Sequence, residues 1–248
     1  MTYPAATAFE PTQDRATPAI GVGDVLERSL RLIAARSPLY GGLFLAAEIA
    51  HRGLIALLDF GLSPWRAQVD FPDTPLLMIA SAVTFVLASQ DVAGRSLSVG
   101  DALARALRRA PALAGMIILQ GLAAAVGLLL FVVPGLVVFC TYAVAGPVCV
   151  VEGLGPIESL SRSAVLTRGD GWRVFGVLAL LYGGGGGFHA LAVAMTKRLS
   201  GDGAAALVAP PLEIALAAVA AVTTAALYAR LRAAREGVAV AQVARVFD

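Results

Sequence analysis

The chain has 248 residues, of which 58% are hydrophobic and only 15% are charged. Soluble domains carry roughly 25% charged residues, so this composition excludes an ordinary water-soluble globular domain. The net charge of +2 lacks the basic excess that marks nucleic-acid-binding proteins, and we expect no nucleic-acid partner.

The first part of the chain predicts a tail, a surface helix and two spans. Residues 1–19 are rich in Thr, Ala and Pro and lack the apolar region of a signal peptide, which predicts a disordered cytoplasmic tail. Residues 22–36 have the pattern of an amphipathic helix and are too charged to cross a bilayer, so we expect this helix to lie on the membrane surface. Spans are predicted at about 38–60 and 74–92.

A long apolar stretch follows, with no Asp, Glu, Lys, Arg or His between Arg109 and Glu152. As one helix it would be roughly 63 Å long at ~1.5 Å per residue, whereas the hydrocarbon core of a bilayer is about 30 Å thick. The stretch must therefore fold back on itself, and Pro134-Gly135 near its middle predicts the hairpin. The two spans that the hairpin joins are predicted at 111–133 and 135–152.

Two more surface helices and two more spans complete the chain. Residues 98–110 repeat the amphipathic pattern, with Ser98 and Asp101 spaced as a capping box. A third short helix is predicted to begin at Pro156, because proline suits the first helical position. The last two spans are predicted at 172–195 and 205–230, and residues 233–248 are predicted to form a cytoplasmic tail.

The distribution of Lys and Arg predicts the topology. With six spans, 15 basic residues fall on the side of the two chain ends and 3 on the other side, in strict alternation along the loops. The positive-inside rule assigns the basic side to the cytoplasm. We therefore expect an all-α, polytopic membrane helical bundle of six transmembrane helices, in the bacterial cytoplasmic (inner) membrane, with both termini in the cytoplasm.

The three surface helices share a motif in which an acid is followed by Leu two positions on, Arg four positions on, and then Ser or Ala. The copies are Asp24-Leu26-Arg28-Ser29, Asp101-Leu103-Arg105-Ala106 and Glu158-Leu160-Arg162-Ser163. Each copy precedes two spans, so residues 20–232 divide into units 20–92, 97–152 and 154–232, a possible threefold repeat. The alternative is that amphipathic surface helices resemble one another by necessity. The acid suits a helix N-terminus, and the Arg can reach a lipid phosphate or a carboxylate.

Further motifs lie between Pro134 and Phe175: the Pro-Gly pair, PVCVVEG at 147–153 and GPIESLSRSAVLTRGDGWRVF at 155–175. With IGVGDVLERSLRL at 20–32, they resemble the membrane domain of glycerophosphoryl diester phosphodiesterases and its stand-alone bacterial relatives. In full-length members of that family a separate soluble domain performs the hydrolysis, and no such domain is present among these residues. The stand-alone relatives have no defined function. One departure is Ala164, where relatives often carry a bulky aromatic residue, which implies a smaller contact between this helix and the bundle.

Motifs of enzymes and cofactor sites are missing from the sequence. There is no His-Glu-x-x-His, no Gly-x-Ser-x-Gly and no phosphate-binding loop, so we expect no catalytic residues, no metal and no cofactor. Cys140 and Cys149 fall on opposite faces of one span and are expected to be buried and unpaired. The run Gly183–Gly187 predicts either close helix packing or, alternatively, an unwound segment lining a substrate site.

Ionisable side chains at membrane depth are the strongest functional signal. Glu48, His51 and Arg52 share one face of the first span, Glu213 follows two prolines in the sixth, and His189 lies in the fifth. Charges at the centre of a bilayer cost roughly 2.5–3.5 kcal/mol each, so these groups should pair or reach water. We hypothesise that they meet in the outer half of the bundle. The alternatives are a structural Glu48–Arg52 ion pair and a water-filled functional cavity.

Two functions remain open from the sequence. The first is a non-catalytic membrane module that supports an envelope or lipid-linked process, with membrane lipids and a possible protein partner in the membrane. The second is a transporter or permease for a small or lipidic solute that uses the polar cluster as its site. A continuous cavity lined by the cluster favours the transporter, whereas mutual pairing of the charged groups favours the module.

Overall fold

A computed structural model describes residues 21–59, 75–92, 94 and 97–244, and every regular element in these ranges is helical. The elements are α1 (Val22–Asp59), α2 (Pro75–Val92), α3 (Val99–Leu130), α4 (Val132–Thr141), α5 (Ala145–Pro147), the π-helix η2 (Val148–Glu152), α6 (Pro156–Thr167), α7 (Gly171–Leu178), the π-helix η3 (Ala179–Gly185) and α8 (Gly186–Ala244). The predicted tail at 1–19 lies outside these residues.

Five stretches of the described chain are long and apolar enough to cross a membrane. They are Val22–Arg52, Val99–Leu130, Val132–Glu152, Gly171–Ala205 and Leu207–Glu236, and the apolar α2 is shorter. In four of the five, less than half of the most apolar window is buried within the protein. Large apolar side chains therefore face outward, as expected for helices solvated by lipid.

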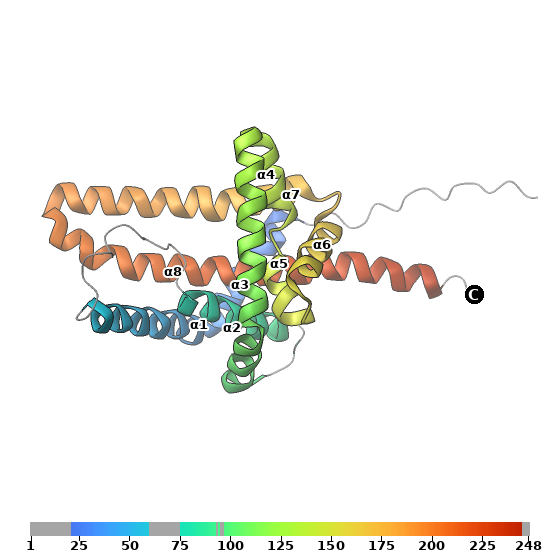
Figure 1. The fold of residues 1–248 in the computed structure, drawn as a ribbon, viewed down its shortest axis with the longest axis horizontal. Coiled ribbons are helices and arrows are strands. Elements are labelled where there is room, and N and C mark those ends of the chain that lie inside the picture. Colours follow the sequence, from blue (N-terminus) through green and yellow to red (C-terminus); the bar gives the residue numbers. More distant parts are fainter. Residues whose placement is uncertain (1–20, 60–74, 93, 95–96, 245–248) are drawn as a thin grey trace, which may run out of the picture.

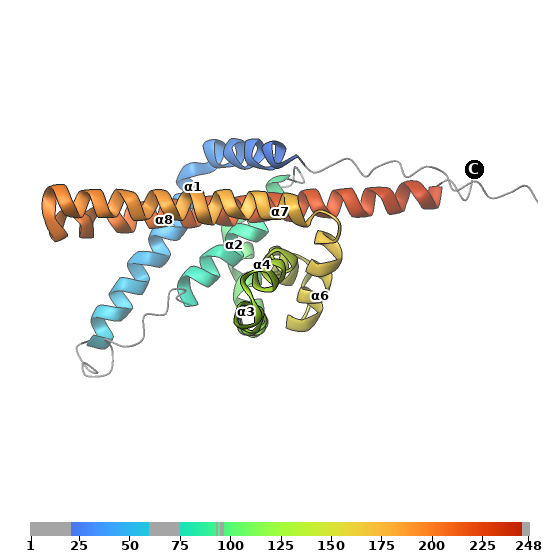
Figure 2. The ribbon, with the colours of Figure 1, turned by 90° about the horizontal axis from the view of Figure 1, so that it is seen from above.

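The helices are arranged in two groups that cross (Figures 1 and 2). α8 turns back on itself at Gly201, whose φ of 82° suits glycine, and with α7 and η3 it forms one long helical hairpin. The hairpin of α3 and α4 runs across this long hairpin rather than alongside it. α2 contacts α1, α3 and α8, so it joins the two groups. The all-helical architecture agrees with the expected helical bundle, and within it the two hairpins cross with α2 between them.

The boundary between the first surface helix and the first span lies where the sequence predicts it. α1 leaves helical geometry at Arg36, with φ −133° and ψ 28°, two residues before Pro38. Proline lacks the N–H of a helical residue and its ring obstructs the preceding turn. The two parts of α1 consequently run in different directions, as Figure 2 shows.

The second surface helix is not a separate element, which corrects the expectation for 98–110. Ser98 caps the helix as predicted and accepts from the backbone N–H of Asp101 at 3.1 Å. α3 then continues through Pro111 to Leu130. Residues on both sides of the proline pack into the same core, including Ala106 and Leu113, and this shared packing keeps the two parts in one helix.

The turn of the central hairpin also differs from the prediction at Pro134-Gly135. The chain reverses at Phe131, which has an extended φ of −170° and ψ of 158°, and α4 already begins at Val132. Pro134 therefore lies in the first helical turn, where its missing N–H costs no hydrogen bond. Gly135 packs against Gly127 of α3, and a methyl group on Gly127 would lie 2.9 Å from the Cα of Gly135.

The fourth span is interrupted in its middle. α4 ends at Thr141, residues 142–144 form a turn, and α5 and η2 complete the segment up to Glu152. α6 begins at Pro156 as predicted, and Gly155 precedes it as N-cap. α6 packs closely against α3 at Gly115, where an added methyl group would lie 3.2 Å from Cγ of Pro156. The break is thus followed by two short helical segments before the chain enters α6.

The glycine run of the fifth span forms part of a π-helix rather than an unwound segment. η3 ends at Gly185, and this glycine faces Leu216 of α8. A methyl group added at Gly185 would lie 3.3 Å from Cδ2 of Leu216. The close-packing interpretation therefore holds at this one position. At its other end α8 continues without interruption to Ala244, so residues 233–244 of the predicted tail extend the last helix.

Candidate functional site

Five polar side chains form a closed ring of hydrogen bonds where η2, α6 and the last part of α8 meet; we call it the polar ring. Its members are Glu152, Arg162, Tyr228, Arg232 and Glu236. Tyr228 Oη donates to Glu152 Oε1 at 2.9 Å, and Arg162 Nε donates to Glu152 Oε2 at 3.2 Å. Arg162 Nη2 donates to Glu236 Oε1 at 2.7 Å. Arg232 closes the ring by donating to Glu236 Oε2 at 2.8 Å and to Tyr228 Oη at 3.1 Å.

Helical spacing brings three members of the ring to one face of α8. Tyr228, Arg232 and Glu236 follow one another at intervals of four residues, which places them in successive turns. Tyr228 is 2% exposed, so its hydroxyl needs the partners that the ring supplies. Glu152 ends η2, just before Gly153, whose φ of 73° turns the chain toward α6.

The polar ring balances its own charge, since it contains two carboxylates and two guanidinium groups. Each carboxylate accepts from a guanidinium, and neither is left as an isolated charge. Removing one partner would leave the other charge uncompensated in a partly buried position, which makes such networks rigid. The ring therefore holds the ends of three elements together and leaves no charged group of its own to act on a substrate.

A similar arrangement lies at the end of α2. Tyr40 Oη donates to Asp91 Oδ2 at 2.8 Å, and Arg36 Nη1 lies 3.4 Å from Asp91 Oδ1. Arg28 Nη2 donates to the carbonyl of Val92 at 3.2 Å. A buried tyrosine and an arginine thus hold the acid that ends a span here as well.

The motif acids take the helix-capping role that the sequence predicts. Gly155 N–H donates to Glu158 Oε2 at 2.8 Å, and Ser98 Oγ donates to Asp101 Oδ2 at 2.6 Å. Asp24 lies over Gly21, because a methyl group there would be 3.0 Å from Asp24 Oδ2. All three acids therefore act within their own helix N-termini.

The three motif arginines differ in the groups that they contact. Arg28 and Arg162 contact the ends of spans, as described above. Arg105 has no hydrogen bond or ion pair within the described ranges. The second and third copies of the possible threefold repeat thus share a capping hydrogen bond of the motif acid, whereas the contacts of the three arginines differ.

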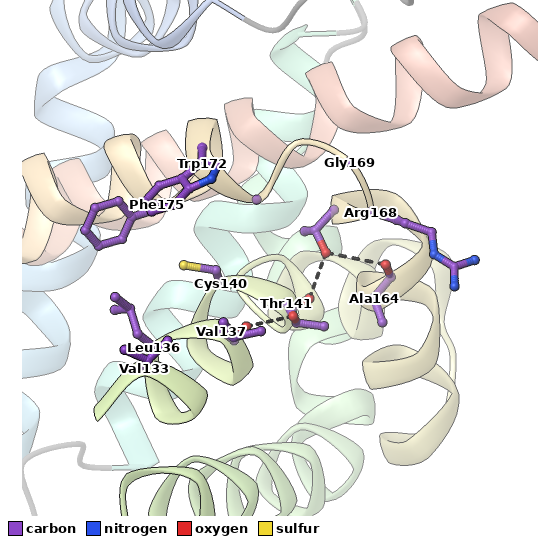
Figure 3. Close-up of a pocket in the computed structure, with 12 residues that line it drawn as sticks. Val133, Leu136, Val137, Cys140, Thr141, Ala164, Arg168, Gly169, Trp172 and Phe175 are labelled. Carbon is purple, nitrogen blue, oxygen red and sulfur yellow. Dashed lines mark hydrogen bonds between the residues drawn. The ribbon is translucent and has the colours of Figure 1, made fainter. Parts of the chain in front are cut away.

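A groove of about 670 Å³ opens between α4, α6 and α7 (Figure 3), and we call it the α4–α7 groove. Ser163 and Thr167 of α6 both donate to the carbonyl of Thr141, at 2.9 and 3.1 Å. This carbonyl is the last of α4, so the hydroxyls replace the helical partner that the break removes. Ala164 lines the groove with Trp172, which is 85% exposed. The small side chain at 164 accordingly leaves space beside α4.

A second cavity, of about 460 Å³, lies at the centre of the molecule, and we call it the central cavity. Its polar side chains are those of Ser81, Gln120, Tyr142, Tyr182, Glu213 and Thr224. Neither Glu48, His51, Arg52 nor His189 lines it. Of the predicted polar cluster, Glu213 alone lines this cavity.

The rest of that cluster divides into a pair and single groups. Arg52 Nε lies 2.5 Å from Glu48 Oε1, with 58% of the Arg52 side chain exposed and 14% of that of Glu48. This is the predicted structural ion pair. His51 makes no hydrogen bond in the described part of the chain, and Nε2 of His189 is buried there without a partner.

Both cysteines are buried and free, as expected. Among the described residues no group of three or more His, Cys, Asp or Glu side chains is placed to hold a metal ion.

The sequence does not indicate the polar ring as a unit. Arg162 is a motif residue and Glu152 ends a predicted span, whereas Tyr228, Arg232 and Glu236 belong to none of the motifs. Their spacing of four residues on one helix was the available signal. It pointed to a polar face where the sixth span was expected to leave the membrane.

The family model described as Domain of unknown function (DUF7847) matches residues 68–234. No curated protein and no solved structure matches the chain.

Proposed function

The chain belongs to the DUF7847 family of domains of unknown function, and from this premise we propose that it is a non-catalytic integral membrane module. In this proposal it supports an envelope or lipid-linked process through helix contacts with lipids and a membrane partner. The six-span topology, with α2 as the shortest span, the bacterial inner membrane and cytoplasmic termini are parts of the same proposal. The proposal also includes kinship with the membrane domain of glycerophosphoryl diester phosphodiesterases.

The observation that carries the proposal is the mutual pairing of charged groups. Both carboxylates of the polar ring, Asp91 and Glu48 each have an arginine partner. Groups that chemistry requires must be available to a substrate, whereas groups that neutralise one another hold helices in place. The crossing hairpins supply large apolar outer surfaces for lipid or protein contact.

Substitutions in the polar ring can test this proposal. In a strain lacking the gene, envelope integrity would be measured as resistance to detergent and compared after complementation with variants. Arg162→Met should fail to complement, because it loosens the junction of η2, α6 and α8. Glu213→Gln should complement fully, because a module without a substrate does not need that carboxylate. Both comparisons require equal amounts of inserted protein, measured in isolated membranes.

A second candidate function is transport of a small or lipidic solute, and the central cavity favours it. Glu213 is the acid of that cavity, and it has no ion pair within the described residues. Loss of complementation by Glu213→Gln at normal membrane levels, with Arg162→Met still active, would contradict the module and favour the transporter.

A further inference from the structure

The central cavity is lined by residues of both crossing hairpins and of α1 and α2. Its wall includes Phe44 of α1, Phe85 of α2, Gln120 of α3, Phe139 of α4 and Glu213 of α8. A volume of about 460 Å³ lies within the range of small-molecule sites, which is roughly 300–1,000 Å³. The place where the hairpins cross is therefore hollow and large enough for a ligand.

Two irregular segments border this cavity. Tyr182 belongs to the π-helix η3, and Tyr142 begins the turn that interrupts the fourth span. Gly146 follows in α5, where a methyl group would lie 2.9 Å from Phe85 Cε2, so glycine allows this ring to approach. Single-turn π-helices occur frequently at functional sites, and irregular backbone at membrane depth is tolerated where it lines a cavity.

The chemistry of the wall is one carboxylate among aromatic rings. Five aromatic side chains contribute, namely Phe44, Phe85, Phe139, Tyr142 and Tyr182. Phe139 and Tyr182 pack edge to face, with ring centroids 5.7 Å apart. Glu213 is an exposed residue that lines the cavity, and among the described residues no arginine, lysine or histidine lines the wall with it. The described part of the site thus combines a negative charge with aromatic side chains and has no cation of its own.

We propose that the central cavity binds a small organic cation that carries an apolar substituent. The carboxylate of Glu213 pairs with the ammonium charge, and the aromatic rings contact both the cation, through cation–π attraction, and its apolar part. An anion is disfavoured by Glu213. A metal ion is disfavoured because Glu213 is the only carboxylate that the described residues bring to the wall, whereas hard cations take six or more oxygen ligands. This goes beyond the proposed function, which requires no ligand.

The test uses the full chain, purified in an uncharged maltoside detergent, and benzyltrimethylammonium as the probe. Neopentylbenzene has the same shape without the charge and serves as the neutral control ligand. Isothermal titration should give saturable binding of the cation at one site. The neutral compound should bind at least tenfold more weakly.

Glu213→Gln should weaken binding of the cation at least tenfold and leave binding of neopentylbenzene unchanged. Glu27→Gln removes the same charge from the exposed surface helix and should bind as the unmodified chain does. If Glu213→Gln does not fold, Phe139→Leu tests the aromatic wall and should weaken cation binding about threefold or more.

Three results would overturn the proposal: no saturable binding of the cation, equal binding of the charged and neutral compounds, or unchanged binding by both Glu213→Gln and Phe139→Leu. Binding by purified protein is independent of complementation in cells. The site proposal and the module proposal can therefore fail separately.

Discussion

The hydroxyl of Tyr228 donates a hydrogen bond of 2.9 Å to the carboxylate of Glu152, 76 residues earlier in the chain. The same hydroxyl accepts from Arg232 at 3.1 Å. One buried oxygen therefore links the end of the interrupted fourth span to the last helix. Through Arg162 and Glu236 this link becomes the closed polar ring.

Tyr228→Phe should destabilise the protein by about 1–3 kcal/mol, because it removes one hydroxyl and leaves both Glu152 and Arg232 short of a partner. Thermal unfolding in detergent would measure the change. Tyr142→Phe is the matched control, since the Tyr142 hydroxyl makes no hydrogen bond in the described structure, and its stability should stay within ~0.5 kcal/mol. Equal stability of both variants would show that the ring contributes nothing.

Arg162→Met should be destabilising, whereas the equivalent change Arg105→Met should not. Arg162 is held by Glu152 and Glu236, while Arg105 occupies the same motif position and has no partner within the described ranges. Because the Arg162 side chain is 30% exposed, water screens the loss, and we expect about 1–2 kcal/mol. Chemical denaturation of the two variants in parallel checks this. Indistinguishable midpoints would argue against a structural role for the ring.

Gly127→Ala and Gly135→Ala should each destabilise the α3–α4 hairpin by roughly 1–3 kcal/mol, because the added methyl group meets backbone atoms of the facing helix. The closest backbone atoms are 2.9 Å away in both cases. Gly121→Ala in α3 is the control: no atom lies within 4 Å of its added methyl group, and alanine favours helix. The melting temperature of Gly121→Ala should be higher than those of the other two variants. The reverse order would contradict the close contact between α3 and α4.

Ala164→Phe should be tolerated or stabilising by about 0.5–2 kcal/mol, since it fills space in the α4–α7 groove. A substitution at the neighbouring Ser163 should instead lower the stability. Ser163→Ala removes a hydrogen bond to the carbonyl of Thr141 from a fully buried position, and we expect a loss of about 0.5–1.5 kcal/mol. Melting temperatures of the two variants should move in opposite directions. A large loss on Ala164→Phe would mean that the groove is closed in solution.

Single cysteines would test the proposed topology. In a chain with Cys140 and Cys149 replaced by Ala, Ser200→Cys should react with a membrane-impermeant maleimide in intact cells. Arg108→Cys should react only after the cells are opened, because the positive-inside rule places this basic loop in the cytoplasm. Both positions are exposed, so burial does not explain a difference. Labelling of both from outside would overturn the assignment of sides.

Local features could be predicted because their causes are local. The kink at Arg36 follows from Pro38, the cap at Ser98 from its own hydroxyl, and the start of α6 from Pro156. The predicted hairpin at Pro134-Gly135 was wrong by about three residues, because proline and glycine suit the first turn of a helix as well as a reversal. Pro111 likewise failed to end a helix whose two parts share one core.

Only the pairing of charged groups within one helix could be predicted. Glu48 and Arg52 meet because four residues separate them on one helix. That Glu152 meets Arg162 and Tyr228, and that Glu213 lines the central cavity, depends on which helix faces meet, and the direction in which each helix crosses its neighbours decides this.

The sequence by itself determined that this protein is helical, that its helices are apolar enough for lipid, and where several of them begin or bend. These properties depend on residues within a few turns of one another. Only the tertiary structure decided that Glu152 meets Tyr228, that Gly127 touches Gly135 and that a cavity open to the outside lies between the crossing hairpins. Hydrophobic burial has no direction, so an apolar helix can pack in many ways, and the close fit of particular side chains selects one.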